Sequence, residues 1–522
     1  MRYYSQGHQL TIEEFKGALS RLPKDNRWVK LGDSLPWDRI EKVYVSKLKN
    51  EKTGAGNLPA RVVIGALIIK HKMNLSDKET IEIIRENPYM QYMLGMSEYS
   101  DRNVFDPSLF VSIRKRLGVD DFNKFTECLL SAPRGDAQND ESDETEGDAA
   151  HNGTLKVDAT CCDAEVRYPT DMDLLHDGLV AVERFLDRFC VAASLPRPRT
   201  NFDAAHAKYC SVIKKKVKQK KQLRSCMEYL IHRLLSNISL TWETIGKGKS
   251  DALQRMRRRD VNLFLTTIRM CDQQKWMFTN GVHRHMERIV SIFQPHIRPI
   301  VRGKAKAKVE FGAKIGAAIV DGYTFIDHHG WSAYNEAEDL LPHLRAYKRR
   351  YGCLPEVLEA DRIYLNRRNR RILHLLKIKI GGHPLGRPSK NEADNRLIAK
   401  YIGERNEIEA TFGTGKRVYK ADDIRAKLPD TGAAWVGACF FVKNVMKFLR
   451  ELYFALIRAL EIHFLQSSFL NFRLILAPTR YSAQFLGQGY SVNPIYCCIP
   501  DECVPLDNRI NSDRDANSLN RS

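Results

Sequence analysis

The chain has 522 residues, 43% of them hydrophobic and 28% charged, which fits an ordinary soluble protein of about three to four domains. Its 83 Lys and Arg against 63 Asp and Glu give a formal net charge of +20, which excludes a charge-balanced surface. Such a surplus favours a polyanionic partner, usually nucleic acid, although an unspecific basic surface remains the alternative.

The remaining bulk features favour the cytoplasm and argue against a membrane. The most apolar stretch, 435–476, is interrupted by charges such as Lys443 and Arg450, whereas a membrane span needs about 20 nearly uncharged residues. The first residues do not resemble a signal peptide, and the 12 Cys show no metal-binding spacing. We therefore expect a cytoplasmic protein with reduced thiols, no membrane partner and a buried amphipathic helix at 435–476.

Residues 1–130 are predicted to form an all-α N-terminal domain. One helix covers 58–70, with Pro59 at its first position, and Ser76 and Glu79 form a capping-box pattern that begins the next helix. A third helix is expected at 108–116. Two short helices joined by a tight turn suggest a helix-turn-helix that binds DNA, but many other small helical domains share this pattern.

Residues 131–153 are acidic and almost free of apolar side chains, so we expect a flexible linker there. A short strand follows at 154–160. From 171 to 295 the pattern is helical, with dense basic tracts at 214–221 and 255–259.

Strand signals return at 308–331, where Asp321-Gly322 predicts the turn of a β-hairpin. A helix (335–351), a buried strand ending at Asp361, a basic helix (366–376), a brief strand (377–381) and a helix (392–412) follow. We expect a mixed α/β catalytic domain made of 154–170 and 296–460, with 171–295 as a basic helical insertion and 461–522 as a C-terminal helix and polar tail.

Three carboxylates carry the candidate chemistry. Asp158 lies within a short apolar strand, Asp361 ends another, and Glu409 lies on a helix. If these elements are neighbours, the carboxylates converge and repel one another unless they hold cations, for which Mg²⁺ is the natural ion. Two such ions about 3.5–4 Å apart suit phosphodiester chemistry. The alternative is that each carboxylate is a turn residue or a helix N-cap.

The segment around Glu409 carries the most specific pattern. Arg405, Glu409 and Lys416 stand four and seven residues apart and so share one helix face, although Gly413 and Gly415 are expected to fray the helix before Lys416. One face would then offer a carboxylate between two cations that bind phosphates. An exposed helix with an ordinary Arg–Glu pair is the alternative.

This segment resembles the R-x3-E-x6-K signature of insertion-sequence DDE transposases, whose catalytic fold is ribonuclease-H-like. Asp361 followed by Tyr364 and the strand around Asp158 resemble the family's other acidic segments, whereas the usual leading Tyr of the signature falls on Ile402. The large insertion lies between the first and second Asp here, and the family commonly places it after the second.

The resemblance implies that Asp158, Asp361 and Glu409 bind two Mg²⁺ or Mn²⁺ ions, while Arg405 and Lys416 contact DNA. It also implies a bacterial, nucleoid-associated endonuclease that acts as a homodimer on double-stranded DNA, cutting terminal inverted repeats and joining the 3′-hydroxyls to a target. A metal-dependent nuclease that joins no strands and a non-catalytic DNA-binding protein remain alternatives.

Several residues compete for these roles or extend them. Glu407 is a rival third acid that points about 200° away from Glu409 on the helix. Asp163, Asp171 and Asp173 are rivals for the first acid, and Trp331 is either a base-stacking residue or a core residue. The basic tracts nominate further phosphate contacts, namely Lys214, Lys215, Arg302, Lys304, Arg367 and Arg368.

Overall fold

The computed structural model describes residues 18–48, 56–130, 151–217, 219–248, 251–301, 309–386 and 391–475. Arg302, Lys304, the tail beyond 475 and residues 131–150 of the expected linker lie outside the described residues. The chain divides into two compact units, Met1–Leu456 and Ile457–Ser522, and the sheet and the candidate site belong to the first.

Residues 18–130 of the first unit fold into helices. These are η2 (Ala18–Arg21), α1 (Arg27–Ser34), α2 (Trp37–Val45), α3 (Ala60–Met73), α4 (Asp77–Glu86), α5 (Pro88–Met93), α6 (Leu109–Arg116) and α7 (Val119–Leu130). The capping box of α4 is confirmed, since Ser76 and Glu79 bond each other's backbone. The placement of Pro59 was wrong by one residue, because its ψ of 143° is extended and makes it the N-cap of α3.

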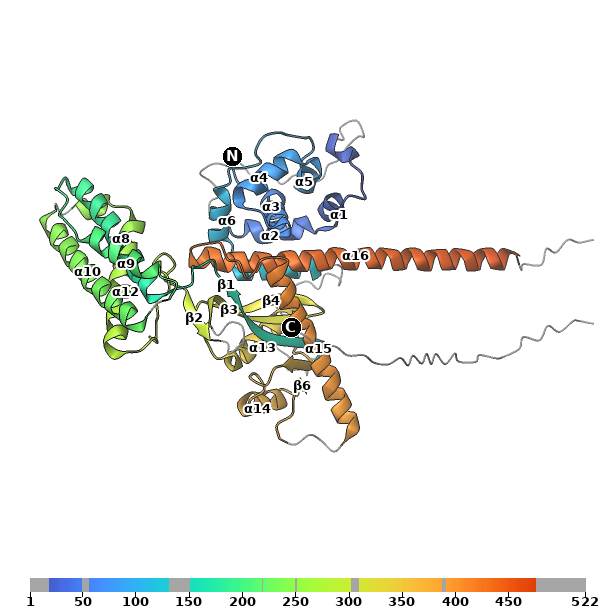
Figure 1. Ribbon diagram of the computed structural model, residues 1–522. Helices are drawn as coiled ribbons and strands as arrows, with labels where there is room; N and C mark the ends of the chain where they lie inside the picture. The colour runs from blue at the N-terminus through green and yellow to red at the C-terminus, as the bar shows by residue number, and fades with distance from the viewer. Residues whose placement is uncertain are drawn as a thin grey trace, which may run out of the picture. The chain divides into compact units, whose positions relative to one another are not determined.

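A six-stranded mixed sheet forms the centre of the unit. Its strands are β1 (Thr154–Asp163), β2 (Arg298–Val301), β3 (Val309–Val320), β4 (Tyr323–Gly330), β5 (Val357–Ala360) and β6 (Lys379–Gly381). The order is β2-β3-β1-β5-β6, with β4 also paired to β3 (Figure 1). β3 runs antiparallel to β1, whereas β5 runs parallel to it. The expected mixed sheet is therefore confirmed.

The β3–β4 hairpin is confirmed at the expected turn. Asp321 and Gly322 have φ values of 50° and 74°, the left-handed pair that a two-residue hairpin turn requires. Two asparagines cover β4 through its backbone: Asn123 of α7 bonds both backbone groups of Ile326, and Asn444 does the same for Thr324. These contacts satisfy an edge that would otherwise be open to another strand.

Between β1 and β2 lies a block of helices (Figure 1, green) with its own hydrophobic core. Its members are α8 (Asp171–Ala193), α9 (Phe202–Ile213), α10 (Lys220–Lys247), α11 (Ala252–Arg255) and α12 (Arg258–Asn280). α10 and α12 both pack on α8. Because β1 and β3 still pair over eight residues, the block leaves the sheet continuous.

The remaining helices follow the hairpin. They are η3 (Glu336–Asp339), α13 (Leu340–Tyr351), α14 (Arg367–Leu375), α15 (Glu392–Arg417) and α16 (Pro429–Ile475). Within α16, Pro429–Ala455 is long and apolar enough to cross a membrane, with a mean hydropathy of 1.2, but 72% of that stretch is buried inside the protein. We interpret the buried part of this stretch as a core helix, which confirms that part of the helix predicted at 435–476, whereas residues 451–455 are exposed.

The expectation that Gly413 and Gly415 fray α15 was wrong, since the helix continues to Arg417. Gly415 is needed for packing: a Cβ there would lie 2.7 Å from the ring of Phe440 on α16. A glycine here lets two helices approach closely, and that tertiary contact compensates its low helix propensity.

We expect Gly415→Ala to lower the free energy of unfolding by about 1–3 kcal/mol, the usual effect of overpacking a core. Gly413 is the matched control, because the nearest atom to its added Cβ is 3.5 Å away on the flexible Arg417 side chain. Gly413→Ala should raise stability by up to about 1 kcal/mol through helix propensity. Urea unfolding of both variants measures the difference, and equal effects would contradict this account of Gly415.

Candidate active site

The sheet places Asp158 and Asp361 on neighbouring parallel strands. Val157 of β1 lies opposite Ala360 of β5, so the two aspartates follow at equivalent positions. Asp158 sits in the middle of β1, and Asp361 comes directly after the end of β5. Each accepts a hydrogen bond from the next backbone N–H, at 2.8 Å from Ala159 and 2.7 Å from Arg362.

The third acid, Glu409, lies on α15, the helix that packs against β1, β5 and β6 beside the two aspartates. Arg405 connects the acids: its Nη1 lies 3.6 Å from Asp158 Oδ2, and its Nη2 lies 3.6 Å from Glu409 Oε1. One guanidinium therefore contacts the first acid and the third, four residues further along the same helix face. The side chain of Glu409 is 65% exposed and that of Asp158 only 17%, so the site opens towards solvent at Glu409.

Burial dominates the electrostatics of Asp158. It raises the pKa of this carboxyl to about 6, against the lowering effect of the Ala159 N–H and the Arg405 charge. Glu336 and Asp361 raise the pKa of Asp158 further, because like charges nearby disfavour ionisation. Burial is therefore the main reason that the charged form of Asp158 is disfavoured.

These surroundings fit a divalent cation. Three hard oxygen donors, one of them buried with its charge disfavoured, are what Mg²⁺ or Mn²⁺ would stabilise. The guanidinium of Arg405 supplies the positive charge between Asp158 and Glu409.

A tighter cluster of metal-ligating atoms lies elsewhere. Within the described part of the chain, the group whose ligand atoms all fall within 4.8 Å of one another is Cys161, Asp163 and Glu310, on β1 and β3. Burial raises the pKa of the Cys161 thiol, and a soft sulfur ligand does not suit a hard ion such as Mg²⁺. This cluster is therefore a weaker candidate metal site than the three carboxylates.

The rival third acid is held away from the site. Glu407 Oε2 lies 2.9 Å from Lys156 Nζ, which also donates to the Glu404 carbonyl at 3.1 Å and lies 3.8 Å from the buried Glu359. Glu407 thus serves an ion-pair network along β1 and β5, while Glu409 faces Arg405.

The rival first acids also have other partners. Asp171 binds Arg288 at 2.9 Å, and Asp173 binds Tyr209 and Arg167, all within or beside the helical block. Burial raises the pKa of Asp163, and the positive charge of Lys416 lowers that pKa. Lys416 therefore lies close enough to the end of β1 to interact with Asp163.

The remaining predicted residues are dispersed. Arg367 and Arg368 are exposed in the first turn of α14, and Lys214 and Lys215 are exposed after α9. Trp331 packs edge-on against His296 and His329, with ring centroids 4.5 and 5.2 Å away, and lies close to Gly432. These contacts favour the core role for Trp331 over base stacking.

One neighbour of the site escaped sequence analysis. Glu336, at the start of η3, raises the pKa of Asp158 and is held by Lys314, whose Nζ lies 2.9 Å from it. The acidic run that follows Asn335 was the available signal, but only the fold shows that η3 lies near β1.

Comparison with known proteins gives three matches. Residues 18–116 match the family model "Transposase domain (DUF772)", and residues 358–446 match "Transposase DDE domain". The "Uncharacterized protein ORF8 in nfe locus" of Rhizobium meliloti is 25% identical over 164 residues, which cover 30% of this chain and 70% of that protein. No solved structure matches the chain.

The second match contains Asp361, Arg405, Glu409 and Lys416, and the mixed α/β sheet is compatible with a DDE domain. DDE transposase domains depend on a divalent metal, and transposases act on DNA. Both matched segments point to the same family, as does the signature around Glu409. The two matches, which together span less than half of the chain, support an insertion-sequence DDE transposase.

Proposed function

We propose that the protein binds the terminal inverted repeats of a bacterial insertion sequence, cleaves its ends and joins the 3′-hydroxyls to target DNA. The observation that carries the proposal is Arg405, which lies 3.6 Å from both Asp158 and Glu409 on the helix that bears the signature. A basic chain of net charge +20 suits the polyanionic substrate.

Asp158, Asp361 and Glu409 would hold two divalent ions, Mg²⁺ or Mn²⁺. When bound, these ions activate a water or a 3′-hydroxyl and stabilise the leaving oxygen. The protein's part is to fix the three carboxylates on two rigid strands and one helix. Arg405 keeps Asp158 and Glu409 together and offers a planar donor pair to a phosphate.

The proposed organisation has three parts. The strand order β2-β3-β1-β5-β6, with β4 also paired to β3 and with β1 and β5 parallel, supports a ribonuclease-H-like core made of 154–170 and 296–460. The helical block of 171–295 and residues 1–130, separated by the linker 131–153, would hold double-stranded DNA in a homodimer in the bacterial cytoplasm, at the nucleoid. Residues 1–130 would read the repeats through a helix-turn-helix.

A strand-transfer assay tests this function. The full chain is incubated with Mg²⁺, a DNA fragment carrying the element's ends, and a supercoiled target plasmid. Joined products of end and target are expected. Cleavage of the ends without joining would favour the nuclease, and binding without cleavage would favour a non-catalytic DNA-binding protein.

A further inference from the structure

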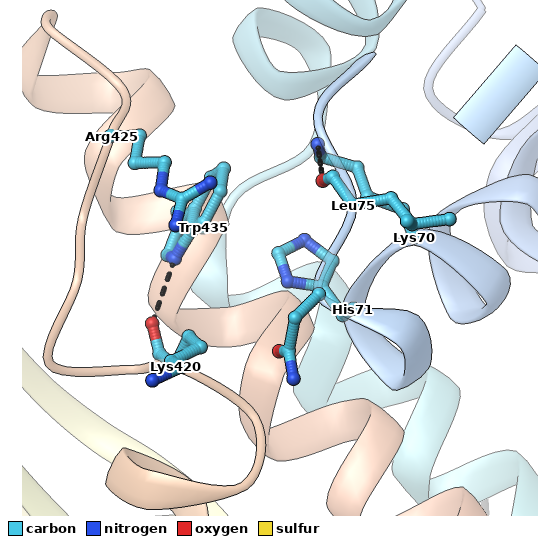
Figure 2. Close-up of a pocket in the computed structure, with 7 residues that line it drawn as sticks. Lys70, His71, Leu75, Lys420, Arg425 and Trp435 are labelled. Carbon is cyan, nitrogen blue, oxygen red and sulfur yellow. Dashed lines mark hydrogen bonds between the residues drawn. The ribbon is translucent and has the colours of Figure 1, made fainter. Parts of the chain in front are cut away.

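The end of α3 packs against the segment that joins α15 to α16. Asn74 Nδ2 donates to the Val418 carbonyl at 3.1 Å, and Trp435 Nε1 donates to the Lys420 carbonyl at 3.1 Å. Figure 2 shows the second of these bonds, with the His71 ring of α3 facing Trp435 at a centroid distance of 4.9 Å. The two segments that match transposase models therefore meet at this junction.

Four basic side chains from three helices gather beside this junction, and we call them the junction surface: Arg27 and Lys30 of α1, Lys72 of α3 and Arg450 of α16. Arg27 Nη2 lies 4.0 Å from Met73 Sδ, which places α1 beside the end of α3. Lys30 Nζ lies 5.6 Å from the ring centre of Tyr453, one helical turn after Arg450. Lys72 Nζ lies 5.9 Å from the ring centre of Tyr419. None of the four belongs to a basic tract of the sequence.

The charges of the junction surface are not neutralised by ion pairs. Among the residues that the structure describes, none of its four cations forms a salt bridge with a carboxylate. Burial lowers the pKa of Lys72, and the charges of Arg27 and Arg450 lower it further, while no acid raises it. Like charges this close destabilise one another. A bound anion would therefore be stabilised here.

The acids nearest in sequence to these cations do not change this balance. Asp33 on α1 accepts a hydrogen bond from the Tyr92 hydroxyl at 2.9 Å, and Glu451 on α16 is bound by Lys447. Asp25, in the loop before α1, can balance only one of the four cations. The junction surface therefore carries an excess of positive charge.

This arrangement fits a polyanion better than a single ion. Arg27 and Lys30 stand one helical turn apart, about 5–6 Å between Cβ atoms, and the other two cations lie on other helices. Each strand of duplex DNA carries one phosphate per about 3.4 Å of helix axis, so different side chains can meet neighbouring phosphates. Tyr453 is 53% exposed beside Lys30, and a tyrosine hydroxyl also donates to phosphate oxygens.

We propose that the junction surface binds the sugar–phosphate backbone of duplex DNA, with Arg27, Lys72 and Arg450 contacting phosphates. The contact is independent of base sequence. DNA is favoured over an acidic protein because transposases act on DNA and both transposase segments meet here. The contact would hold the N-terminal helices and α16 on one stretch of DNA. The proposal rests on the proposed function only in taking DNA as the partner.

The test measures the affinity of the full chain for a DNA duplex at several salt concentrations. Arg27→Gln, Lys72→Gln and Arg450→Gln should each weaken binding about tenfold at low salt, the usual loss of one charge-assisted contact. Each should also reduce the log–log salt slope by about 0.9. Lys72→Arg should bind as wild type does. Lys124→Gln removes the same charge from the exposed face of α7 and should change neither quantity.

Two further arms identify the ligand. A single neutral methylphosphonate is moved along each strand of the duplex. It should weaken wild-type binding at neighbouring positions, and Lys72→Gln should be insensitive at one of them. An unrelated duplex should lose affinity by the same factor in each variant, and a loss confined to the element's ends would contradict a backbone contact. Loss of polyglutamate binding with unchanged DNA binding would overturn the DNA assignment in favour of an acidic protein.

The outcome also separates this proposal from the proposed function. If the three glutamine variants bind DNA as Lys124→Gln does, the junction surface is not a DNA contact, whatever the wild type does in the strand-transfer assay. If the wild type joins no strands while the three variants still lose DNA affinity and salt slope, the proposed function fails and the contact stands. Thermal unfolding of each variant checks that a weaker affinity does not come from loss of the fold.

Discussion

Asp158→Asn is expected to lower the rate of end cleavage with Mg²⁺ by at least about a thousandfold, equivalent to about 4 kcal/mol of transition-state stabilisation. The amide has the same shape but no negative charge, and it removes a largely buried anionic oxygen donor of the site. DNA binding should stay within a few fold of wild type, because the substitution keeps the shape of the side chain and leaves Arg405 in place. Gel-based cleavage kinetics and a binding titration measure the two effects.

Asp171→Asn is the matched control for this variant. Asp171 was a rival for the first acid, and its carboxylate is bound to Arg288 and Gln274 beside the helical block. We expect this variant to cleave DNA at the wild-type rate, with at most a loss of thermal stability. A thousandfold loss in Asp171→Asn with an active Asp158→Asn would reverse the assignment of the first acid.

Asp327→Asn is expected to lower the free energy of unfolding by about 3–5 kcal/mol, the usual cost of breaking a buried ion pair. The Asp327 side chain is 1% exposed and binds His343 Nδ1 at 2.8 Å and the Arg350 guanidinium, which are 0% and 3% exposed. The substitution leaves Arg350 buried with only Glu127, at 3.1 Å and partly in solvent. Because these residues link β4, α13 and α7, the loss should appear as a shift of the whole urea transition.

The same cluster predicts how this loss depends on pH. Burial acts to raise the pKa of Asp327, but His343 and Arg350 hold it below its usual value. A lowered pKa contributes stability that is present above the unfolded value of about 3.9 and is lost as pH falls through the folded value. The difference between wild type and Asp327→Asn should therefore be full near neutral pH and shrink below about pH 4. Asp38→Asn on the exposed face of α2 serves as control and should change stability by less than about 0.5 kcal/mol.

Local features of the fold were predictable because each is specified by a few adjacent residues. Ser76 and Glu79 begin α4 through their own backbone contacts, and Asp321-Gly322 adopts the φ values that the hairpin requires. Glu409 was preferred to Glu407 by the spacing of the R-x3-E-x6-K signature, and helix periodicity places the two acids on different faces. These signals need no knowledge of distant residues.

The failures come from contacts between distant parts of the chain. Gly415 remains helical because Phe440, on another helix, fills the space a side chain would take. Lys156 binds Glu407 across 251 positions, and the sequence around Glu407 shows no sign of it. Lys72 and Arg450 come together in the same way, so no pattern near either residue indicates the junction surface.

The most direct test of the three-carboxylate site compares Glu409→Gln with Glu407→Gln in end cleavage with Mg²⁺. Both acids lie on α15 and each substitution removes one charge, but only Glu409 faces Arg405, while Glu407 binds Lys156. We predict that Glu409→Gln abolishes cleavage while it still binds DNA, and that Glu407→Gln retains cleavage with a modest loss of stability. Full cleavage activity in Glu409→Gln would contradict the proposed site.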